Sequence, residues 1–567
     1  MKVLLLCHAF NGLAQRLFVE LRAAGHAVSV ELDIADAVTE EAVARWQPDL
    51  VLAPFLKRRI PESVWSRVLC WVVHPGPPGD GGPHALDWAI ERGLDTWGVT
   101  VLQAVHDYDA GPIWAWRPFA MRPDAGKGSL YRHEVTTAAV AAVFDALRRW
   151  RPGATAPSPA PDLPAQRGRW QPAMTAAQRA IDWQHDDTAT VLRRLRAADG
   201  MSGVRDTWFD VPVRLFDGHA ASAEDLARAP AGDLVARRGP ALLRRTADGG
   251  VWIGHVKRGD PPGPKLAATR AFAAETQALP ELAVPLQRDD ATWDELRYRR
   301  HGAVGTLSFA FHNGAMSVRQ ARRLIDALAE VARDDARVLV LDGGPDFFGN
   351  GIHLHDIEAA SLEGGSAADA SMAAIEAIDD VALAILQMTD RLTVAALRGN
   401  AGAGGCFLAL AADAVWLHRG VVQNPHYRNM GNLHGSEYWT YLLPRRVGPE
   451  QARQIMRGRL PMGAEEALQL GLADAVLADD ASGFDAAVAQ AAQALAGDPD
   501  WAIQVAAKAA RRAADEAQRP LAAYRADELA AMRVNFYGFD PSYHVARHHF
   551  VHRKPHAWTP RHLALHR

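Results

Sequence analysis

A histidine and an aspartate in two separate turns are the first residues that could do chemistry. His74 ends an apolar stretch and opens a loop rich in proline and glycine, and Asp109 begins the tight turn DAGPI. An imidazole held in position by a carboxylate can shuttle a proton during acyl transfer. Loops at the carboxyl edge of an open α/β sheet can meet above one cleft. The pair therefore predicts a proton shuttle, although spacing alone leaves open that His74 is a capping or surface-loop histidine.

The elements expected to position these residues form an α/β domain over residues 1–150. Short apolar runs alternate with helical periodicity, which is typical of βαβ units with a parallel sheet. The apolar runs cover residues 3–7, 27–30, 50–53 and 68–73.

Two further domains are expected after a linker. A segment rich in proline and alanine, residues 151–166, predicts that linker. A helix and short alternating segments predict a small β-barrel-like module over 167–265. Residues 290–567 restart a strand, helix and strand pattern and end in a helical tail. The predicted fold class is multidomain α/β.

The composition favours small-molecule chemistry. A chain of 567 residues is too long for one core. The net charge of −4, with both signs mixed, gives no reason to expect nucleic acid or a membrane as partner. Three cysteines, all in apolar runs, argue against a disulfide framework or a zinc site. No apolar stretch approaches the roughly 20 residues that span a bilayer, and we expect a cytoplasmic protein.

The first domain resembles the 10-formyl-tetrahydrofolate-dependent formyltransferases of the glycinamide ribonucleotide and methionyl-tRNA kinds. The likeness rests on PDLVLAP, the His-Pro loop, LDWAI, GVTV and DAGPI. It implies that His74 and Asp109 are catalytic and that 10-formyl-tetrahydrofolate is the one-carbon donor. It also implies, by position only, that Lys57 and Arg59 in FLKRR lie beside the pteridine.

One position departs from that family. Val72 stands where the formyltransferases have an asparagine, so either another group polarises the formyl oxygen or the chemistry differs. Asn11, on the first βα loop, is the polar candidate for this folate-binding role. The alternative is that Asn11 caps the helix beginning near Gly12.

The module after the linker resembles the formyltransferase C-terminal module, especially in AIDW and LRAADG. In the tRNA enzymes that module helps to bind RNA. Because the sequence shows no conspicuous basic face here, a spacer or packing role is favoured.

Residues 303–478 resemble the crotonase-fold enzymes. The likeness rests on FFGNGIHLHDIE, GNAGAGGCFLALAADAV and GRLPMGAEEALQLGLADAVL. Those enzymes hold a thioester carbonyl with two backbone N–H groups. The resemblance implies donors at Asn350 and Gly404, with Gly351 giving the turn its freedom, and coenzyme A as a ligand. The alternative is that these glycines only permit tight helix packing.

The hydratases' two catalytic glutamates are missing. Phe407 and His426 stand at those positions, so water addition by paired carboxylates is not expected. Tyr427 and Glu437 are the predicted proton-handling pair, with His426 and His434 as lesser candidates. The alternatives are a core tyrosine and an ordinary carboxylate at a helix start.

The order of these domains, with the terminus NFYGFDPSYHVARHHF, resembles a family of hydrogenase maturation factors called HypX or HoxX. The resemblance implies a bifunctional enzyme that makes carbon monoxide for the [NiFe]-hydrogenase iron centre. Formyl would pass from 10-formyl-tetrahydrofolate to coenzyme A, and formyl-CoA would be decarbonylated to CO and CoA. The hydrogenase maturation machinery would be its protein partner.

Two other functions remain open. One is a formyltransferase acting on an amine, with a second domain that hydrolyses acyl-CoA or senses CoA. The other is a non-catalytic protein that binds folate and CoA and delivers something to a hydrogenase precursor.

The histidine-rich terminus is a last candidate for chemistry. His544, His548 and His552 are spaced to share one face of a helix, an arrangement that suits nickel or zinc ligands. A solvated or domain-packing tail is the favoured interpretation, and no metal site is predicted.

Overall fold

The computed structural model describes residues 1–151, 153–157, 168–200, 202–226 and 229–567. The chain forms two compact units. Unit 1 comprises Met1–Val235, Leu243–Gly259 and Pro555–Arg567, and unit 2 comprises Ala236–Leu242 and Asp260–Lys554. Most of the linker predicted at 151–166 lies outside the described residues.

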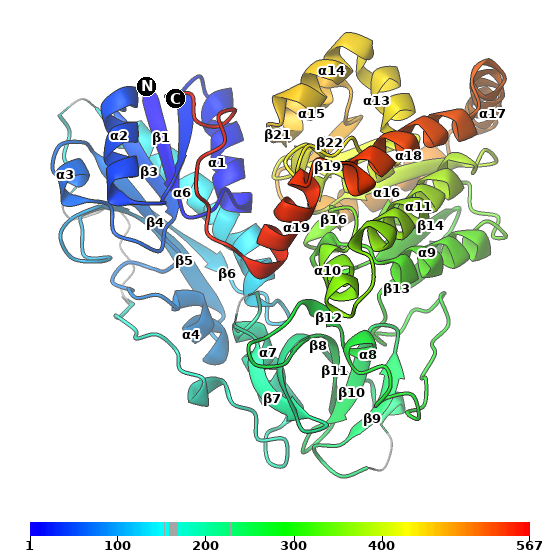
Figure 1. Ribbon diagram of the computed structural model, residues 1–567, viewed down its shortest axis with the longest axis horizontal. Coiled ribbons are helices and arrows are strands. Elements are labelled where there is room, and N and C mark those ends of the chain that lie inside the picture. The colour runs from blue at the N-terminus through cyan, green and yellow to red at the C-terminus, as the bar shows by residue number, and fades with distance from the viewer. Residues whose placement is uncertain (152, 158–167, 201, 227–228) are drawn as a thin grey trace. The chain divides into compact units, whose positions relative to one another are not determined.

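A six-stranded sheet forms the centre of the first α/β domain (Figure 1), in the order β2-β1-β3-β4-β5-β6. Its strands are β1 (Lys2–Cys7), β2 (Ala27–Leu32), β3 (Leu50–Phe55), β4 (Cys70–His74), β5 (Thr96–Gln103) and β6 (Ile113–Ala120). The pairings from β2 to β4 are parallel, as expected. However, β5 runs antiparallel to both β4 and β6, so the sheet is mixed.

Helices cover this sheet because its strands are apolar on both faces. On one face, Leu4 and Leu6 of β1 share a core cluster with Ala42 and Val43. The helices are α1 (Gly12–Ala23), α2 (Asp36–Trp46), α3 (Glu62–Trp65), α4 (Ala85–Glu91), α5 (Lys127–Leu130) and α6 (Thr136–Arg149).

The end of the chain packs on the edge strand of this sheet. The backbone N–H of Val30 in β2 donates to the carbonyl of Leu563 at 2.9 Å. Buried Glu31 accepts hydrogen bonds from His566 at 2.7 Å and Arg567 at 2.8 Å, and also from the Thr559 hydroxyl. The tail therefore satisfies polar groups that an edge strand would otherwise expose. The expectation that all of 290–567 belongs to the last domain is corrected for Pro555–Arg567.

The small β-module expected over 167–265 is a second six-stranded sheet. Strands β7-β8-β11-β10-β9 follow one another, and β12 pairs with β11. The helix α7 (Thr188–Ala197) precedes β7 (Val204–Trp208), β8 (Val211–Ala220), β9 (Leu234–Arg238), β10 (Ala241–Arg245), β11 (Gly250–Arg258) and β12 (Lys265–Ala267).

Unit 2 is built on two sheets. The larger has the order β13-β14-β15-β17-β19-β22, parallel from β14 onward, and the smaller has the order β16-β18-β20-β21. The larger comprises β13 (Leu296–His301), β14 (Val304–Phe309), β15 (Val338–Asp342), β17 (Leu392–Leu397), β19 (Ala414–His418) and β22 (Ala475–Ala478). The smaller comprises β16 (Phe347–Gly349), β18 (Asn400–Gly402), β20 (Val422–Asn424) and β21 (Met462–Gly463).

Alternate residues of the central strands face two different cores. Leu339 and Leu341 of β15 belong to one cluster, whereas Val338 and Val340 belong to the other. This period of two is what a strand covered on both faces requires. The strand, helix and strand pattern predicted for the start of residues 290–567 is confirmed by β14, α9 and β15.

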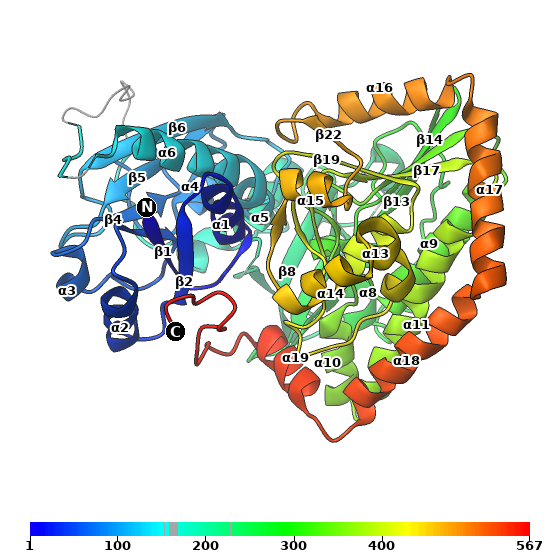
Figure 2. The same cartoon turned by 90° about the horizontal axis from the view of Figure 1, so that it is seen from above.

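Helices surround these sheets, and α16, α17 and α18 run along the outside of unit 2 (Figure 2). The predicted tail helix is two helices, because Pro520 separates them. The helices are α8 (Ala268–Ala271), α9 (Val318–Val331), α10 (Leu354–Leu362), α11 (Ala367–Leu386), α12 (Gly404–Leu410), α13 (Trp439–Val447), α14 (Pro449–Gly458), α15 (Ala464–Leu470), α16 (Phe484–Ala496), α17 (Trp501–Gln518), α18 (Leu521–Tyr537) and α19 (Ser542–His552).

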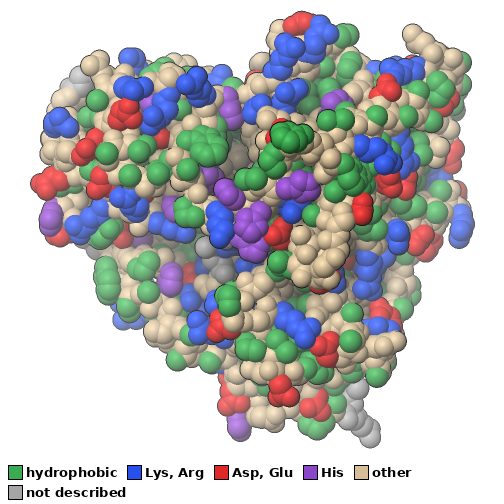
Figure 3. Space-filling model, in the orientation of Figure 1, with side chains coloured by type: hydrophobic (Ala, Val, Ile, Leu, Met, Phe, Trp, Pro, Cys, Tyr) green, Lys and Arg blue, Asp and Glu red, His purple; other side chains and the backbone are tan. Residues whose placement is uncertain are grey.

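The surface agrees with the mixed composition. Basic and acidic side chains are interspersed on the face drawn in Figure 3. Among the described residues, no helix is both long and apolar enough to cross a bilayer.

Substitution of Glu31 tests the attachment of the tail. Burial raises the pKa of Glu31, but hydrogen bonds from His566, Thr559 and Arg567 outweigh burial and leave that pKa below its usual range. Removing one member of a buried charge pair costs about 3 kcal/mol. We therefore expect Glu31→Gln to release residues 555–567, seen as faster trimming by carboxypeptidase. Glu41→Gln is the control, because Glu41 contacts Arg567 at the surface. Equal trimming of the Glu31 variant and the parent protein would contradict this account.

Candidate active sites

The His74 imidazole lies between two carboxylates in unit 1. Its Nε2 is 2.9 Å from Oδ2 of Asp80, and its Nδ1 is 3.5 Å from Oδ1 of Asp109. His74 and Asp80 are buried, and Asp109 is partly exposed. Such an arrangement fixes the ring and stabilises a positive charge on it during proton transfer. The structure thus brings the two sequence-predicted residues together.

His74 and Asp109 come together for a different reason from the one expected from the sequence. Because β5 is antiparallel to β4, Asp109 does not follow a strand parallel to β4. Instead, the Asp109 carboxylate accepts a hydrogen bond from the N–H of Gly82 at 3.0 Å, which ties its turn to the loop after His74. Thr100 and Trp97 of β5 donate to carbonyls of the same loop.

Asp80 is the residue that sequence reasoning missed. Burial raises the pKa of Asp80, and its hydrogen bond with His74 opposes that shift. Gly76 makes the close contact possible, since a Cβ there would lie 2.3 Å from Oδ2 of Asp80 and 2.5 Å from Nε2 of His74. The sequence HPGPPGD contains a pattern that could have identified Asp80, because this acidic residue ends the glycine-rich loop that begins at the histidine.

Asn11 occupies the position of a helix cap. Its side-chain oxygen accepts a hydrogen bond from the N–H of Ala14 at 3.0 Å, at the start of α1. This is the structural alternative named for Asn11, and a folate-binding role stays a prediction. Val72, where an asparagine was expected, is partly buried in β4 between Ala53 of β3 and Leu102 of β5.

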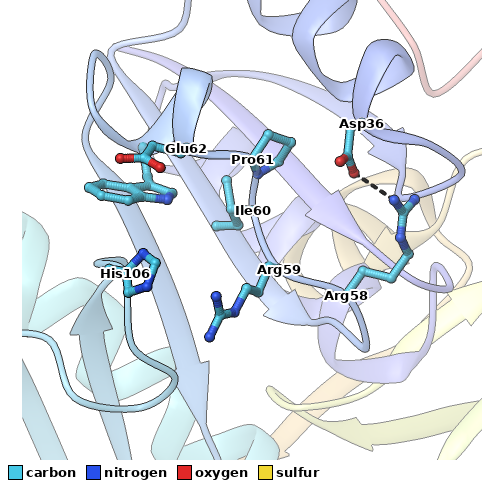
Figure 4. Close-up of a pocket in the computed structure, with 8 residues that line it drawn as sticks. Asp36, Arg58, Arg59, Ile60, Pro61, Glu62 and His106 are labelled. Atoms are coloured by element: carbon cyan, nitrogen blue, oxygen red, sulfur yellow. Dashed lines mark hydrogen bonds and ion pairs between the residues drawn. The ribbon is translucent and has the colours of Figure 1, made fainter.

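The loop after β3 borders a pocket (Figure 4). Its volume is about 310 Å³, and its lining comprises Asp36, Arg58, Arg59, Ile60, Pro61, Glu62, Trp65 and His106. Arg59 lies over the ring of Tyr108 at 4.3 Å, next in sequence to Asp109. Arg59 thus lines a cavity, as a ligand-binding cation would. Lys57 is absent from the lining formed by the described residues.

In unit 2, the turn at Gly351 lies against the start of α12. The ideal Cβ position of Gly351 lies 3.5 Å from the backbone nitrogen of Gly404, the first residue of α12. Gly405 could carry no side chain, because a Cβ would lie 2.0 Å from the carbonyl oxygen of Gly349. Ala403 before them has a φ of 49°, a left-handed conformation that turns the chain sharply into α12.

The prediction that Asn350 supplies an oxyanion donor is corrected. The N–H of Asn350 donates to the carbonyl of Gly314 at 2.7 Å, so it is already engaged. The residues on either side of Ile352 bond to Met316. The carbonyl of Gly351 accepts from the N–H of Met316, and the N–H of His353 donates to the carbonyl of Met316. Within the described part of the chain, the N–H groups of Ile352 and Gly404 have no acceptor.

Tyr427 and Glu437 form a buried pair beside this turn. The Tyr427 hydroxyl donates to Oε2 of Glu437, and the ring stacks on Phe407 with centroids 5.3 Å apart. A Cβ on Gly404 would lie 2.5 Å from Oε1 of Glu437, so the carboxyl group touches the start of α12. Burial raises the pKa of both groups, and the nearby Asp379 charge raises that of Glu437 further. The buried Tyr427–Glu437 pair therefore lies at the start of α12, and its role in handling a proton stays a prediction.

Two carboxyl groups distant in sequence hold Glu437 in place. Oδ1 of Asp379 in α11 accepts from the N–H of Glu437 at 2.7 Å, and Oε2 of Glu528 in α18 accepts from the N–H of Tyr438 at 2.9 Å. Glu437 and Tyr438 both have positive φ, 60° and 59°, so Glu437 is not the helix-start carboxylate of the alternative. Burial raises the pKa of Asp379, and it raises that of Glu528 to about 8.

The lesser candidates take other positions. His434 Nδ1 bonds to the carbonyl of Gly435 at 3.0 Å, and its ring packs against Trp439. His426 is buried.

Replacing Asp379 tests the coupling of these carboxyl groups. A carboxyl group with a raised pKa binds more protons in the folded than in the unfolded state. Folding stability therefore falls as pH rises from about 4 through the raised pKa. The fall is up to about 1.4 kcal/mol per pH unit for each such group. We expect Asp379→Asn to flatten this fall, because the asparagine keeps the acceptor for Glu437 but carries no charge. Thermal unfolding at several pH values between about 6 and 8.5 measures this dependence of stability on pH. Asp380→Asn, at a half-exposed carboxylate that pairs with Arg525, is the control. The same pH slope in Asp379→Asn and in the parent would contradict the coupling.

Known proteins resemble the whole chain and each half. The chain is 53% identical to the hydrogenase maturation factor HoxX of Bradyrhizobium diazoefficiens, over 100% of this chain and 97% of that protein. The crystal structure of HypX from Aquifex aeolicus in complex with tetrahydrofolic acid matches with a TM-score of 0.94 and 41% identity, covering 100% of this chain and 99% of that one. Residues 305–559 match the enoyl-CoA hydratase/isomerase family. A methionyl-tRNA formyltransferase of Dichelobacter nodosus is 27% identical over 33% of this chain and 61% of that protein. On the whole-length relationship, this multidomain α/β chain belongs to the HypX/HoxX family of hydrogenase maturation factors.

Proposed function

We propose that this maturation factor makes carbon monoxide by formyl transfer from 10-formyl-tetrahydrofolate to coenzyme A, followed by decarbonylation of formyl-CoA. The observation that carries the proposal is the Tyr427–Glu437 pair beside the Gly404 turn. This pair is proton-handling machinery in a fold whose family acts on CoA thioesters, and the hydratase glutamates are replaced by Phe407 and His426. Tetrahydrofolic acid bound to the Aquifex protein supports folate as the formyl donor.

In the first step, His74 acts as the proton shuttle. The imidazole accepts the thiol proton of coenzyme A as sulfur attacks the formyl carbon, and it returns a proton to the folate nitrogen as the C–N bond breaks. The carboxylates of Asp80 and Asp109, one beside each ring nitrogen, stabilise the imidazolium formed between these events. Lys57 and Arg59 are proposed folate contacts, and the pocket beside Arg59 supports the second of them.

In the second step, the N–H groups of Gly404 and Ile352 hold the thioester oxygen. Glu437, which accepts the hydrogen bond of the Tyr427 hydroxyl, is the base that removes the formyl proton. The C–H electrons become the lone pair on carbon of CO, and the C–S electrons leave with sulfur. The proton then passes to the thiolate, so the products are CO and the free thiol. The raised pKa of Glu437 suits this role, because a weaker acid is a stronger conjugate base.

Two assays on variants separate the steps. We expect His74→Ala to reduce CO formation from 10-formyl-tetrahydrofolate with CoA by roughly 10²–10⁴-fold, the usual contribution of a positioned base, and to leave decarbonylation of added formyl-CoA unchanged. Glu437→Gln should reduce CO from both substrates. Haem-protein absorbance measures the CO released.

Matched variants make these outcomes specific. Asp109→Asn should resemble His74→Ala, whereas Asp107→Asn, at an exposed carboxylate two residues away, should resemble the parent. Equal losses in both assays for His74→Ala would refute the division of labour. Formyl product on an amine without CO would favour the alternative transferase, and no turnover by the purified protein would favour the delivery protein.

A further inference from the structure

A carboxylate and two imidazoles that neither proposed reaction step uses converge where α10 and α19 of unit 2 meet. Glu358 of α10 is buried, and His548 and His552 come from consecutive turns of α19. Nδ1 of His548 is 3.1 Å and Nε2 of His552 is 2.8 Å from the same oxygen, Oε1 of Glu358. The two imidazole rings lie side by side, with centroids 4.3 Å apart and planes tilted by 40°.

The spacing of these atoms suits a transition-metal ion. The three ligand atoms all lie within 4.8 Å of one another. An ion about 2.0–2.2 Å from each ligand, as Zn²⁺ prefers, requires ligand atoms roughly 3–3.5 Å apart. The distances from Oε1 to both ring nitrogens are close to this requirement, so a small rotation of the rings admits an ion. Two imidazoles and one carboxylate form a ligand set that Zn²⁺ accepts, with water in the fourth position.

The surroundings of Glu358 prepare it as a ligand. Its second oxygen accepts a hydrogen bond from Nε of Arg547 at 2.9 Å, which leaves Oε1 to the histidines. Arg547 also bonds to His544, so the third histidine of the predicted face orients the arginine.

Solvent reaches the cluster through its histidines. The side chain of His548 is 47% exposed and that of His552 is 28% exposed, whereas that of Glu358 is only 5% exposed. Histidine side chains gather over α19 on the face drawn in Figure 3. An ion can thus enter from water and displace the two imidazole hydrogen bonds.

We propose that Glu358, His548 and His552 bind one divalent transition-metal ion of the zinc type, which clamps α19 onto α10. The helix α10 begins at Leu354, two residues after the Ile352 donor. A metal clamp therefore steadies the element that follows the thioester turn. This site reverses the expectation that the terminus binds no metal.

Equilibrium dialysis of the full-length, untagged protein with Zn²⁺ tests the proposal after treatment with a chelator. We expect one high-affinity ion per chain, and a dissociation constant at least ten-fold larger in Glu358→Gln and in His552→Ala, since loss of even an outer-shell partner costs about 10–100-fold. His549→Ala is the control, because that exposed histidine lies on the same helix outside the cluster.

A second measurement uses the parent protein, so it does not require any variant to fold. Co²⁺ added to the parent protein should give the intense visible absorbance of a tetrahedral or five-coordinate site, and Zn²⁺ should slow hydrogen exchange in α19. Equal zinc affinity in His552→Ala and the parent, or no stoichiometric binding by the parent, would overturn the proposal. In either case the cluster is only an ion-pair anchor for the terminal helix.

Discussion

The site of unit 2 depends on two carboxyl groups that hold a strained stretch of backbone. Glu437 and Tyr438 are consecutive residues in the left-handed region, which costs of order 1–2 kcal/mol for each residue with a side chain. Their successive N–H groups donate to Asp379 and Glu528. The kink directs the Glu437 carboxyl group toward Tyr427 and the first turn of α12. Without these acceptors, α13 would begin earlier and Glu437 would take the solvated position of an ordinary helix-start carboxylate.

The same constraint explains the unusual density of buried acids. A buried carboxyl group is costly unless it is hydrogen-bonded or neutral, and the contact of Asp379 with Glu437 makes double ionisation unfavourable. Burial therefore raises the pKa of both carboxyl groups, and the Asp379 charge raises that of Glu437 further. In unit 1 the opposite solution is used, because His74 lies between Asp80 and Asp109 and supplies the compensating positive charge when it is protonated.

Features of the fold that depend on local sequence patterns could be predicted from the sequence. The strands and helices of the second half followed from periodicity, and α9 begins where Ser317 and Gln320 form a capping box. The meeting of His74 with Asp109 and of Tyr427 with Glu437 was anticipated, although the first was argued from a parallel pairing that β5 does not make. Local pattern could not reveal Asp80, Asp379 or Glu528 as partners. Asp379 and Glu528 lie 58 and 90 residues from the N–H groups they bind, and only tertiary packing joins them. The Asn350 donor was misplaced because turn glycines locate a loop but do not tell which N–H is already bonded to Gly314.

The central claim is that one chain converts a folate-bound formyl group into carbon monoxide through a CoA thioester. The most direct test mixes the purified protein with 10-formyl-tetrahydrofolate, with and without coenzyme A, and follows CO by the spectral shift of a haem protein. The account predicts CO only when coenzyme A is present, together with release of tetrahydrofolate. Release of tetrahydrofolate without CO in the presence of coenzyme A would contradict it and leave a transferase or hydrolase of another kind.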